Sequence, residues 1–493
     1  MKKIFWIITL TGVLIFTGCG NNGNPASSGL TLDFFSSKIE GEITVSAYDS
    51  MIYKNYLEEA ARLFEELYPG TKVNIETFSV MPEVRSGTQG NMQVMQMQMQ
   101  DDPQGRADYI SRVNTNLMSG SGADIYAMDV LPLQKFVESG ALENLSSYMN
   151  IDPEFNKNDY RQNILDALVY RNGTWFLPVD FNFSYFAYDS TLIPADIASE
   201  FGTDKAWNTA DLITMGTSLY TGSYKLFNQT DYTGVRGGMF SQLLYENIQS
   251  YVNLETGRAN FTDGGFTGLL TSVKNYAQQG YIPAAVTGQQ NVNRGMSMNM
   301  ETAADRFFFK LNEAFSLFTQ FTRNTGLMVG MRTTGTVAAI EADDEIAGIR
   351  ANADGSVPFT YSQAFGINSQ SKNKETAWAF LKFLLSKEMQ LSTNISSMTF
   401  PLNNEARNEK AEFLFSGTFL SINISLTDQH RQAMENYIAA VEELSDNINS
   451  FVIQDSSLND MISQDVRYFF DGSRTADEVA RTLQNKADLY LSE

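Results

Sequence analysis

The chain has 493 residues, of which 43% are hydrophobic and 19% are charged, and 57 acids against 35 bases give a formal net charge of −22. Because domains usually span about 100–200 residues, this length predicts two large lobes, and the apolar content is sufficient for a substantial core. The acidic balance argues against a nucleic-acid partner, since binding to a phosphate backbone requires clustered Lys and Arg.

The rarest residues exclude several kinds of site. The sequence holds a single cysteine, Cys19, and a single histidine, His430. A disulfide within the chain therefore cannot form, a zinc site made of several Cys and His cannot be assembled, and a Ser-His-Asp triad would depend on His430. That histidine stands at the polar start of a predicted helix, so we expect it to be exposed. We predict no metal site and no cofactor, although the many acids leave carboxylate catalysis and Ca²⁺ binding open.

The N-terminus has the features of a secretory signal. Two lysines follow Met1, residues 4–16 form an apolar run shorter than a comfortable membrane span, and small residues precede Cys19. This arrangement resembles the lipobox of bacterial lipoproteins, which implies that residues 1–18 are removed and that Cys19 is lipidated. Residues 19–40, rich in Gly, Asn and Ser at their start, are interpreted as a flexible tether. A buried cysteine behind an uncleaved anchor is the alternative.

The first part of the body has the pattern of an α/β protein. Residues 41–48 and 72–78 alternate between apolar and polar side chains and predict strands, whereas residues 54–68 place Tyr56 and Phe64 on one helical face. A strand, a helix and a strand in this order predict a βαβ unit with a parallel sheet.

Residues 79–105 combine conflicting signals. Met and Gln alternate over residues 92–100 as in a strand, although both favour helices. A low-complexity lead-in to the next helix, expected over 107–118, is the preferred interpretation, and an adaptable Met-rich binding face is the alternative.

The later part of the chain also mixes strands and helices. We expect Trp207 to pack beneath a helix capped by Asn208 or Thr209, and Trp378 to lie in the core. Neither a repeat nor a clear linker is evident, which predicts lobes that are discontinuous along the chain. The further predicted elements are a buried strand ending in an acid, a short helix, an aromatic strand-rich segment, an apolar helix and a terminal helix, at residues 123–129, 133–142, 173–188, 377–385 and 475–491.

No motif identifies a catalytic site. The glycine-rich run at 234–238 lacks the spacing of a phosphate-binding loop, and the acidic runs at 101–102 and 343–345 are typical of solvated surface. With 57 acids, the sequence neither identifies nor excludes the pair of carboxylates that a glycosidase requires. Aromatic residues near predicted strand ends stand out instead, because pyranose rings pack their C–H faces on aromatic rings beside polar groups. These residues are Tyr48, Trp175, Phe176, Phe181, Phe183, Tyr185 and Tyr361.

Five segments together resemble the extracellular solute-binding proteins of family 1, the substrate-capturing lipoproteins of bacterial ABC importers, which include the maltodextrin-binding protein. Their order and spacing, rather than any one of them, carry the resemblance, which extends from residue 41 to the end; 79–105 is less typical. The segments are residues 41–50, 118–149, 172–193, 206–212 and 365–390.

The resemblance implies an α/β fold of the periplasmic-binding-protein-like type II, in which two discontinuous lobes enclose a ligand cleft. The implied N-terminal lobe comprises residues 41–180 and 326–361, and the implied C-terminal lobe comprises residues 181–325 and 362–493. The ligand would lie between the lobes, beyond the carboxyl ends of the strands. Crossings between the lobes are expected near residues 180–182, 326–332 and 361–365.

Transfer from the family's motifs gives seven expected ligand-binding residues. They are Asp129 and Asp180, which would accept hydrogen bonds from sugar hydroxyls, Arg332 and Gln363, which would donate, and Tyr48, Phe181 and Tyr361, which would stack on the sugar.

The implied function is capture of a carbohydrate, with an oligosaccharide preferred, hinge closure around it and delivery to an ABC permease, without catalysis. The protein would be a monomer held at the extracytoplasmic face of the bacterial membrane by the lipid on Cys19. Three alternatives stay open: a cell-surface carbohydrate-active enzyme with paired carboxylates, a sensor or adhesion module that presents a ligand, and a binding protein for a polyol, phosphodiester or peptide.

Overall fold

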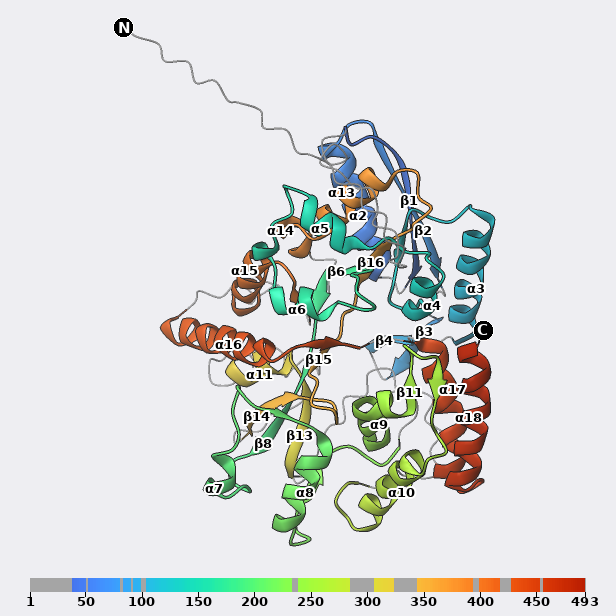
Figure 1. Cartoon of the computed structure of the whole chain (residues 1–493). Coiled ribbons are helices and arrows are strands. Elements are labelled where there is room, and N and C mark those ends of the chain that lie inside the picture. Colours follow the sequence, from blue (N-terminus) through green and yellow to red (C-terminus); the bar gives the residue numbers. More distant parts are fainter. Residues whose placement is uncertain are drawn as a thin grey trace, which may run out of the picture.

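Two α/β lobes, each built on a five-stranded sheet, lie one above the other in Figure 1. The expected fold class is therefore confirmed. The computed structural model describes residues 38–49, 52–79, 83–89, 92–98, 103–232, 238–283, 306–322, 344–392, 399–416, 427–452 and 455–492, and for 83–89 and 92–98 it concerns the backbone.

The first lobe contains strands β1 (Gly41–Asp49), β2 (Thr71–Ser79), β5 (Ile125–Ala127), β6 (Leu177–Pro178) and β16 (Ala364–Ile367). Their order in the sheet is β2-β1-β5-β16-β6. Strand β1 pairs in parallel with β2 and β5, whereas β16 is antiparallel to β5 and β6. The helices of this lobe are α2 (Ile52–Leu67), α3 (Pro103–Ser119), α4 (Leu133–Glu138), α5 (Leu145–Ile151), α6 (Gln162–Ala167), α13 (Lys374–Leu384), α14 (Lys387–Gln390) and α15 (Asn404–Phe415), with a 3₁₀ turn at Lys157–Asp159.

The predicted βαβ unit at the start of the body is confirmed. Tyr56, Ala60 and Phe64 recur every four residues on α2 and are all fully buried. The Phe64 ring packs edge-on against Phe380 of α13, with 5.1 Å between centroids. Because this apolar stripe is removed from water, the helix is stabilised by packing as well as by its own propensity.

The second lobe contains strands β8 (Ser184–Asp189), β9 (Ala206–Trp207), β10 (Lys225–Phe227), β13 (Phe307–Glu313) and β14 (Asp344–Arg350). Their order is β10-β13-β8-β14-β9, with β8 antiparallel to both of its neighbours. Its helices are α7 (Ala195–Ala198), α8 (Thr209–Leu219), α9 (Gly238–Tyr251), α10 (Gly265–Gln278), α17 (Ser456–Phe470) and α18 (Ala476–Ser492), with a hairpin of β11 (Val252–Asn253) and β12 (Arg258–Ala259).

Two short strand pairs and two helices lie where the lobes meet, and Figure 1 shows β15, α11 and α16 at this level. Strand β7 (Asp180–Phe181) pairs with β17 (Phe400–Pro401), and β15 (Pro358–Phe359) pairs with β18 (Ser450–Phe451). Helices α11 (Ser316–Thr322) and α16 (Asp428–Asp446) pack together beside them. The chain passes from the first sheet to the second between β6 and β8, as expected near 180–182. It passes between the sheets again from β14 to β16, near the expected 361–365, but there it runs from the second lobe to the first, opposite to the expected direction. The crossing expected at 326–332 lies outside the described residues.

The lobe boundaries differ from those expected after residue 325. Strand β14, expected in the N-terminal lobe, belongs to the second sheet, and β16, expected in the C-terminal lobe, belongs to the first. Helices α13–α15 follow β16 into the first core, and only α17 and α18 return to the second. A short apolar strand is recognisable from its pattern, but its sheet is chosen by tertiary pairing, which the pattern does not encode.

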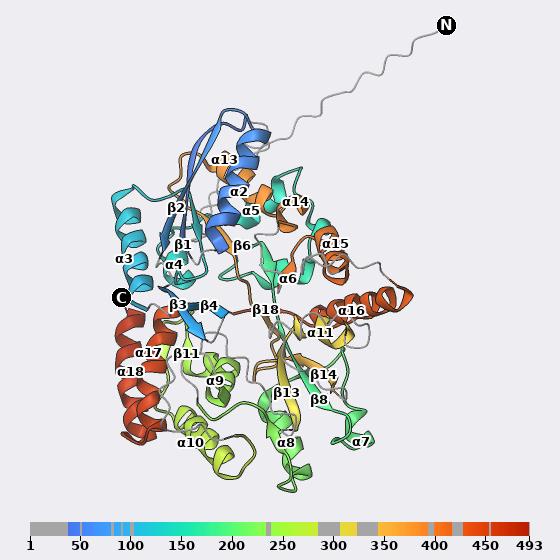
Figure 2. The ribbon, with the colours of Figure 1, turned by 180° about the vertical axis from the view of Figure 1, so that it is seen from behind.

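The Met- and Gln-rich segment forms an antiparallel hairpin of β3 (Glu83–Gln89) and β4 (Met92–Gln98). The preferred interpretation as a lead-in to a helix is therefore wrong, and the alternation was the better guide. Figures 1 and 2 both place this hairpin between the two lobes.

His430 is buried, contrary to expectation, with 6% of its surface exposed. Its Nδ1 accepts a hydrogen bond from the Thr427 backbone N–H at 3.1 Å, and the Thr427 hydroxyl accepts one from the His430 N–H. This reciprocal cap starts α16. The expectations for the tryptophans agree with the structure: Asn208 caps α8 above Trp207, and Trp378 is 2% exposed in the first core.

Candidate functional site

A cavity of about 530 Å³ lies between the two lobes. We call it the main cavity. Its volume falls in the range of small-molecule sites, roughly 300–1,000 Å³. Its lining includes Arg106 of α3, Asp129 and Val130 after β5, Gln229 after β10, Ser241, Gln242 and Tyr245 of α9, Glu313 of β13, Arg350 of β14, and Ser456, Asn459 and Asp460 of α17.

Strand ends direct several of these side chains into the gap between the lobes. Asp129 follows β5, Glu313 is the last residue of β13, and Arg350 is the last residue of β14. Loops and side chains at the carboxyl ends of strands form the ligand crevice in open α/β sheets. The sheets of both lobes therefore contribute to one cavity.

Arg350 anchors the second-lobe wall. Its Nε donates to Glu246 Oε1 at 2.9 Å, its Nη2 donates to the Gln242 carbonyl at 2.7 Å, and its guanidinium lies 4.2 Å from the centre of the Tyr245 ring. The Glu246 carboxylate also accepts from the backbone and hydroxyl of Thr209. Burial raises the pKa of Glu246, and the charge of Arg350 opposes that rise. This network holds the aromatic face of Tyr245 beside the cavity.

Glu313 brings a second carboxyl group to the same wall. It accepts hydrogen bonds from Asn182 Nδ2 and Ser184 Oγ, each at 3.2 Å. Glu313 is exposed at the cavity, yet desolvation by the surrounding protein raises its pKa, and these two neutral donors together with Arg350 only partly oppose the rise. Hydrogen-bond donors on a ligand would therefore find a strong acceptor here.

Among the residues that the structure describes, two glutamine side-chain oxygens of the lining have no hydrogen-bond donor. Gln242 donates its amide to Thr209 Oγ1 at 2.5 Å, but its Oε1 accepts no hydrogen bond from the described residues. Gln229 Oε1 is also buried and likewise accepts no hydrogen bond from the described residues. A buried polar atom without a partner costs about 1–3 kcal/mol, and both glutamines belong to the wall of the main cavity.

No group of three or more Asp, Glu, His or Cys side chains in the described ranges is placed to hold a metal ion. Over the same residues, no helix is both long enough and apolar enough to cross a bilayer.

Of the seven residues expected to bind ligand, Asp129 lines the main cavity. Arg332 lies outside the described residues, as does Cys19. Tyr48 is half-buried and stacks on Phe78, with 6.2 Å between ring centroids. The other four, Asp180, Phe181, Tyr361 and Gln363, are buried and do not belong to the cavity lining.

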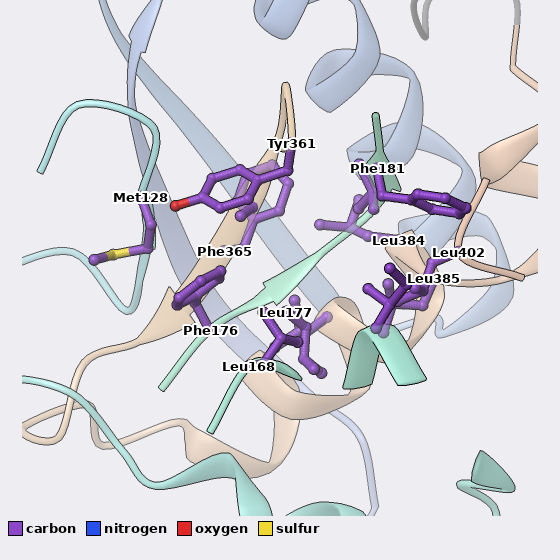
Figure 3. Packing of buried hydrophobic residues seen from close by; sticks show 14 of the residues in the cluster. Met128, Leu168, Phe176, Leu177, Phe181, Tyr361, Phe365, Leu384, Leu385 and Leu402 are labelled. Carbon is purple, nitrogen blue, oxygen red and sulfur yellow. The ribbon is translucent and has the colours of Figure 1, made fainter. Parts of the chain in front are cut away.

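Asp180 has a set of internal partners. Its fully buried carboxylate accepts from the Ser362 backbone N–H at 2.8 Å, from the Ser362 hydroxyl and from Thr399 Oγ1 at 2.9 Å. Phe181 packs on Phe400, and Tyr361 tilts against Phe176 at 5.2 Å. Figure 3 shows Phe181 and Tyr361 among Leu and Phe side chains of this cluster. Asp180, Phe181 and Tyr361 are therefore held by partners within the protein, whereas Gln363 Oε1 is buried without a donor among the described residues.

The sequence analysis missed the second-lobe wall. Gln242, Tyr245, Glu313 and Arg350 come from a helix and two strands separated by long stretches of chain. Charged residues at the ends of strands, as at Glu313 and Arg350, could have indicated this wall. That signal can be used only after the strands themselves have been assigned correctly.

Comparison with known proteins places the fold in a family. Residues 48–391, more than half of the chain, match the family model of the bacterial extracellular solute-binding proteins. A search of the curated proteins finds no match.

Solved structures share the fold over nearly the whole chain. A sugar-binding protein from Xanthomonas citri aligns with a TM-score of 0.54 at 13% identity. The alignment covers 92% of this chain and 98% of the Xanthomonas chain. A family 1 extracellular solute-binding protein from Alicyclobacillus acidocaldarius has a TM-score of 0.52 at 15% identity, with 93% and 100% covered. An ABC substrate-binding protein from Listeria monocytogenes in complex with cycloalternan has a TM-score of 0.50 at 16% identity, with 92% and 99% covered. The chain belongs to the bacterial extracellular solute-binding protein family.

Proposed function

We propose that the protein captures a carbohydrate in the main cavity and delivers it to the permease of an ABC importer. The family supplies the role of solute capture outside the cytoplasm. Two of the solved structures with the same fold are described as binding sugars, one of them the cyclic oligosaccharide cycloalternan. Lobes that close around a bound sugar are part of this proposal, because a ligand that touches both lobes stabilises the closed arrangement.

The observation that carries the proposal is a cavity lined by polar side chains and an aromatic ring. Gln229, Gln242, Glu313 and Tyr245 all line it, and the Glu313 carboxylate has two neutral donors among the described residues. Sugar hydroxyls supply donors in several directions, and the apolar face of a pyranose packs on an aromatic ring. Asp129 is assigned the corresponding role on the wall of the first lobe.

Thermal melting of the purified chain against mono- and oligosaccharides tests the proposal. A sugar with a Kd near about 1 μM stabilises the folded protein by roughly 4 kcal/mol when present at about 1 mM. For lobes of this size, the midpoint rises by roughly 2–4 °C per kcal/mol. A panel without any shift would contradict carbohydrate binding.

A matched pair of variants assigns the binding to the main cavity. Gln242→Leu keeps the shape of the side chain but removes the acceptor, and we expect it to abolish most of the thermal shift. Gln432→Leu makes the same change at an exposed position of α16 and should leave the shift intact. Equal shifts for both variants would place the sugar elsewhere.

The carboxylates of Asp129 and Glu313 make the enzymatic alternative testable in the same samples. We propose binding without turnover, so chromatography should recover the oligosaccharide unchanged after prolonged incubation. Product formation would favour the carbohydrate-active enzyme instead.

Membrane attachment through Cys19 is a further part of the proposal. The signal-like residues before this cysteine and the tether after it support the proposal, and tethering would raise the local concentration of the protein at its permease. We expect Cys19→Ser to move the protein from the membrane fraction to the medium. Retention of that variant in the membrane fraction would contradict lipidation at this residue.

A further inference from the structure

The charged side chains of the main cavity carry a surplus of negative charge. Among the described residues, the lining contains the acids Asp129, Glu313 and Asp460 and the bases Arg106 and Arg350. Arg106 and Asp460 offset each other, because their side chains form an ion pair of 2.7 Å in the cavity wall. The charge that a ligand meets therefore depends on the other two acids and on Arg350.

The charge of Arg350 is offset from behind the wall. Its Nε donates to Glu246 Oε1 at 2.9 Å, and the Glu246 side chain is only 1% exposed and does not belong to the lining. With Glu246 included, four carboxyl groups stand against two guanidinium groups. The formal balance of the site is therefore negative by two charges, and a ligand with a positive group would correct it.

Glu313 is the carboxyl group best placed to receive such a group. It ends β13, it lines the cavity and it is exposed there, so a ligand can reach its carboxylate. Its hydrogen bonds from Asn182 Nδ2 and Ser184 Oγ are both 3.2 Å long, and both donors are neutral. Desolvation by the surrounding protein raises the pKa of Glu313, so the ionised form is short of stabilising charge.

We propose that the main cavity takes an amino sugar, a carbohydrate with a protonated amine, and that its ammonium group binds the Glu313 carboxylate. The inference rests on the proposed function and narrows its substrate class. A hydroxyl gives this carboxylate one more neutral donor, whereas an ammonium gives a charged one and so completes a salt bridge. The net charge of −22 acts in the same direction, because a negative potential raises the local concentration of cations.

Calorimetric titration of the full chain with sugars that differ at C2 alone tests the inference. The β-1,4-linked dimer of glucosamine and cellobiose share their rings and linkage, but the first has ammonium groups where the second has hydroxyls. The di-N-acetylated dimer has neutral amides at the same positions. At about pH 6.5, below the range of about 7.7–8.0 typical of an α-amino group, we expect the glucosamine dimer to bind about tenfold or more tightly than either neutral dimer.

A matched pair of variants assigns this preference to Glu313. Glu313→Gln keeps the shape of the side chain and an acceptor but removes the charge, and we expect it to reduce the preference to about twofold or less. Glu435→Gln makes the same change at an exposed position of α16 outside the cavity and should keep the full preference. A merely structural role of Glu313 would weaken the charged and neutral dimers equally and would leave their ratio unchanged.

The outcomes separate the two proposals. If a neutral sugar, cellobiose or maltose, binds as tightly as the glucosamine dimer, or if the preference persists in Glu313→Gln, the amino-sugar assignment is overturned and carbohydrate capture stands. Spermidine carries ammonium groups without a sugar ring. If spermidine binds and none of the sugars does, or if nothing binds, carbohydrate capture fails and the amino-sugar assignment fails with it.

Discussion

Arg106 of α3 and Asp460 of α17 form an ion pair between the two lobes, with 2.7 Å between Nη2 and Oδ2. The two side chains are 8% and 15% exposed, and both residues line the main cavity. Nearby, Lys135 of α4 donates to the Tyr490 carbonyl at 2.9 Å, so several contacts connect the first lobe to the C-terminal helices. The lobes therefore meet at the cavity wall as well as at the strands that cross between them.

Loss of this ion pair should separate the lobes. Arg106→Ala leaves the Asp460 carboxylate in a poorly solvated place, which costs about 3 kcal/mol and favours arrangements in which water reaches it. We expect a larger radius of gyration for the ligand-free variant in small-angle X-ray scattering. Arg62→Ala breaks an exposed pair within α2 and should leave the radius unchanged. If Arg106→Ala has the same radius of gyration as the wild type, the other contacts between the lobes are sufficient to hold them together.

Glu313 should make stability depend on pH in an identifiable way. Desolvation by the surrounding protein raises the pKa of this exposed residue in the folded state, whereas in the unfolded chain it titrates near about 4.3. Between these values only the unfolded state has released the proton, so the free energy of unfolding falls as the pH rises through this window.

Urea unfolding from pH 4 to 8 measures this dependence. Glu313→Gln keeps an acceptor for Asn182 and Ser184 but cannot ionise, so its stability relative to the wild type should increase as the pH rises. The exposed Glu435→Gln serves as the control and should track the wild type. A constant difference between Glu313→Gln and the wild type would mean that Glu313 titrates normally.

Gly348 is required by the bulge in β14. Its φ angle is 151°, and an added Cβ would lie 2.5 Å from the carbonyl oxygen of Lys205, the residue before the neighbouring strand β9. Gly348→Ala should therefore lower the free energy of unfolding by about 3 kcal/mol. Gly355 also has a positive φ, of 83°, but open space around it, so Gly355→Ala should cost only about 1 kcal/mol. Similar losses in denaturant unfolding would show that β14 shifts to accommodate the methyl group.

Trp378 combines packing with a buried hydrogen bond in the first core. Its ring contacts Tyr148 and Phe155, and its Nε1 donates to Asp152 Oδ2 at 2.6 Å. Trp378→Ala should cost about 4 kcal/mol through the cavity that it leaves. Trp378→Phe keeps most of the contact and loses the donor, while Lys382 stays 2.8 Å from the carboxylate, so it should cost about 1–2 kcal/mol. Equal losses for the two variants would assign the whole effect to the hydrogen bond.

Elements with local periodicity could be predicted from the sequence. The strand–helix–strand unit at residues 41–79 appears with nearly the expected bounds, because alternation and the four-residue recurrence of Tyr56, Ala60 and Phe64 are properties of the segment itself. Asp129 could be found for a related reason, since it lies two residues after the end of the short buried strand β5. The pattern of residues 92–98 also showed a strand, although helix propensity was given more weight.

Tertiary contacts decided the rest. The sheet that each late strand joins depends on its pairing partner. Strand β14 pairs with β8, and β16 pairs with β5, which lie far away in the chain. The same holds for the main cavity, where Gln242, Glu313 and Arg350 meet only after three elements have packed. By itself, the sequence determined the kind of protein, its early βαβ unit and the strand end at Asp129. The structure decided the lobe membership and the walls of the cavity, because these follow from long-range pairing and burial, which leave no periodic signal along the chain.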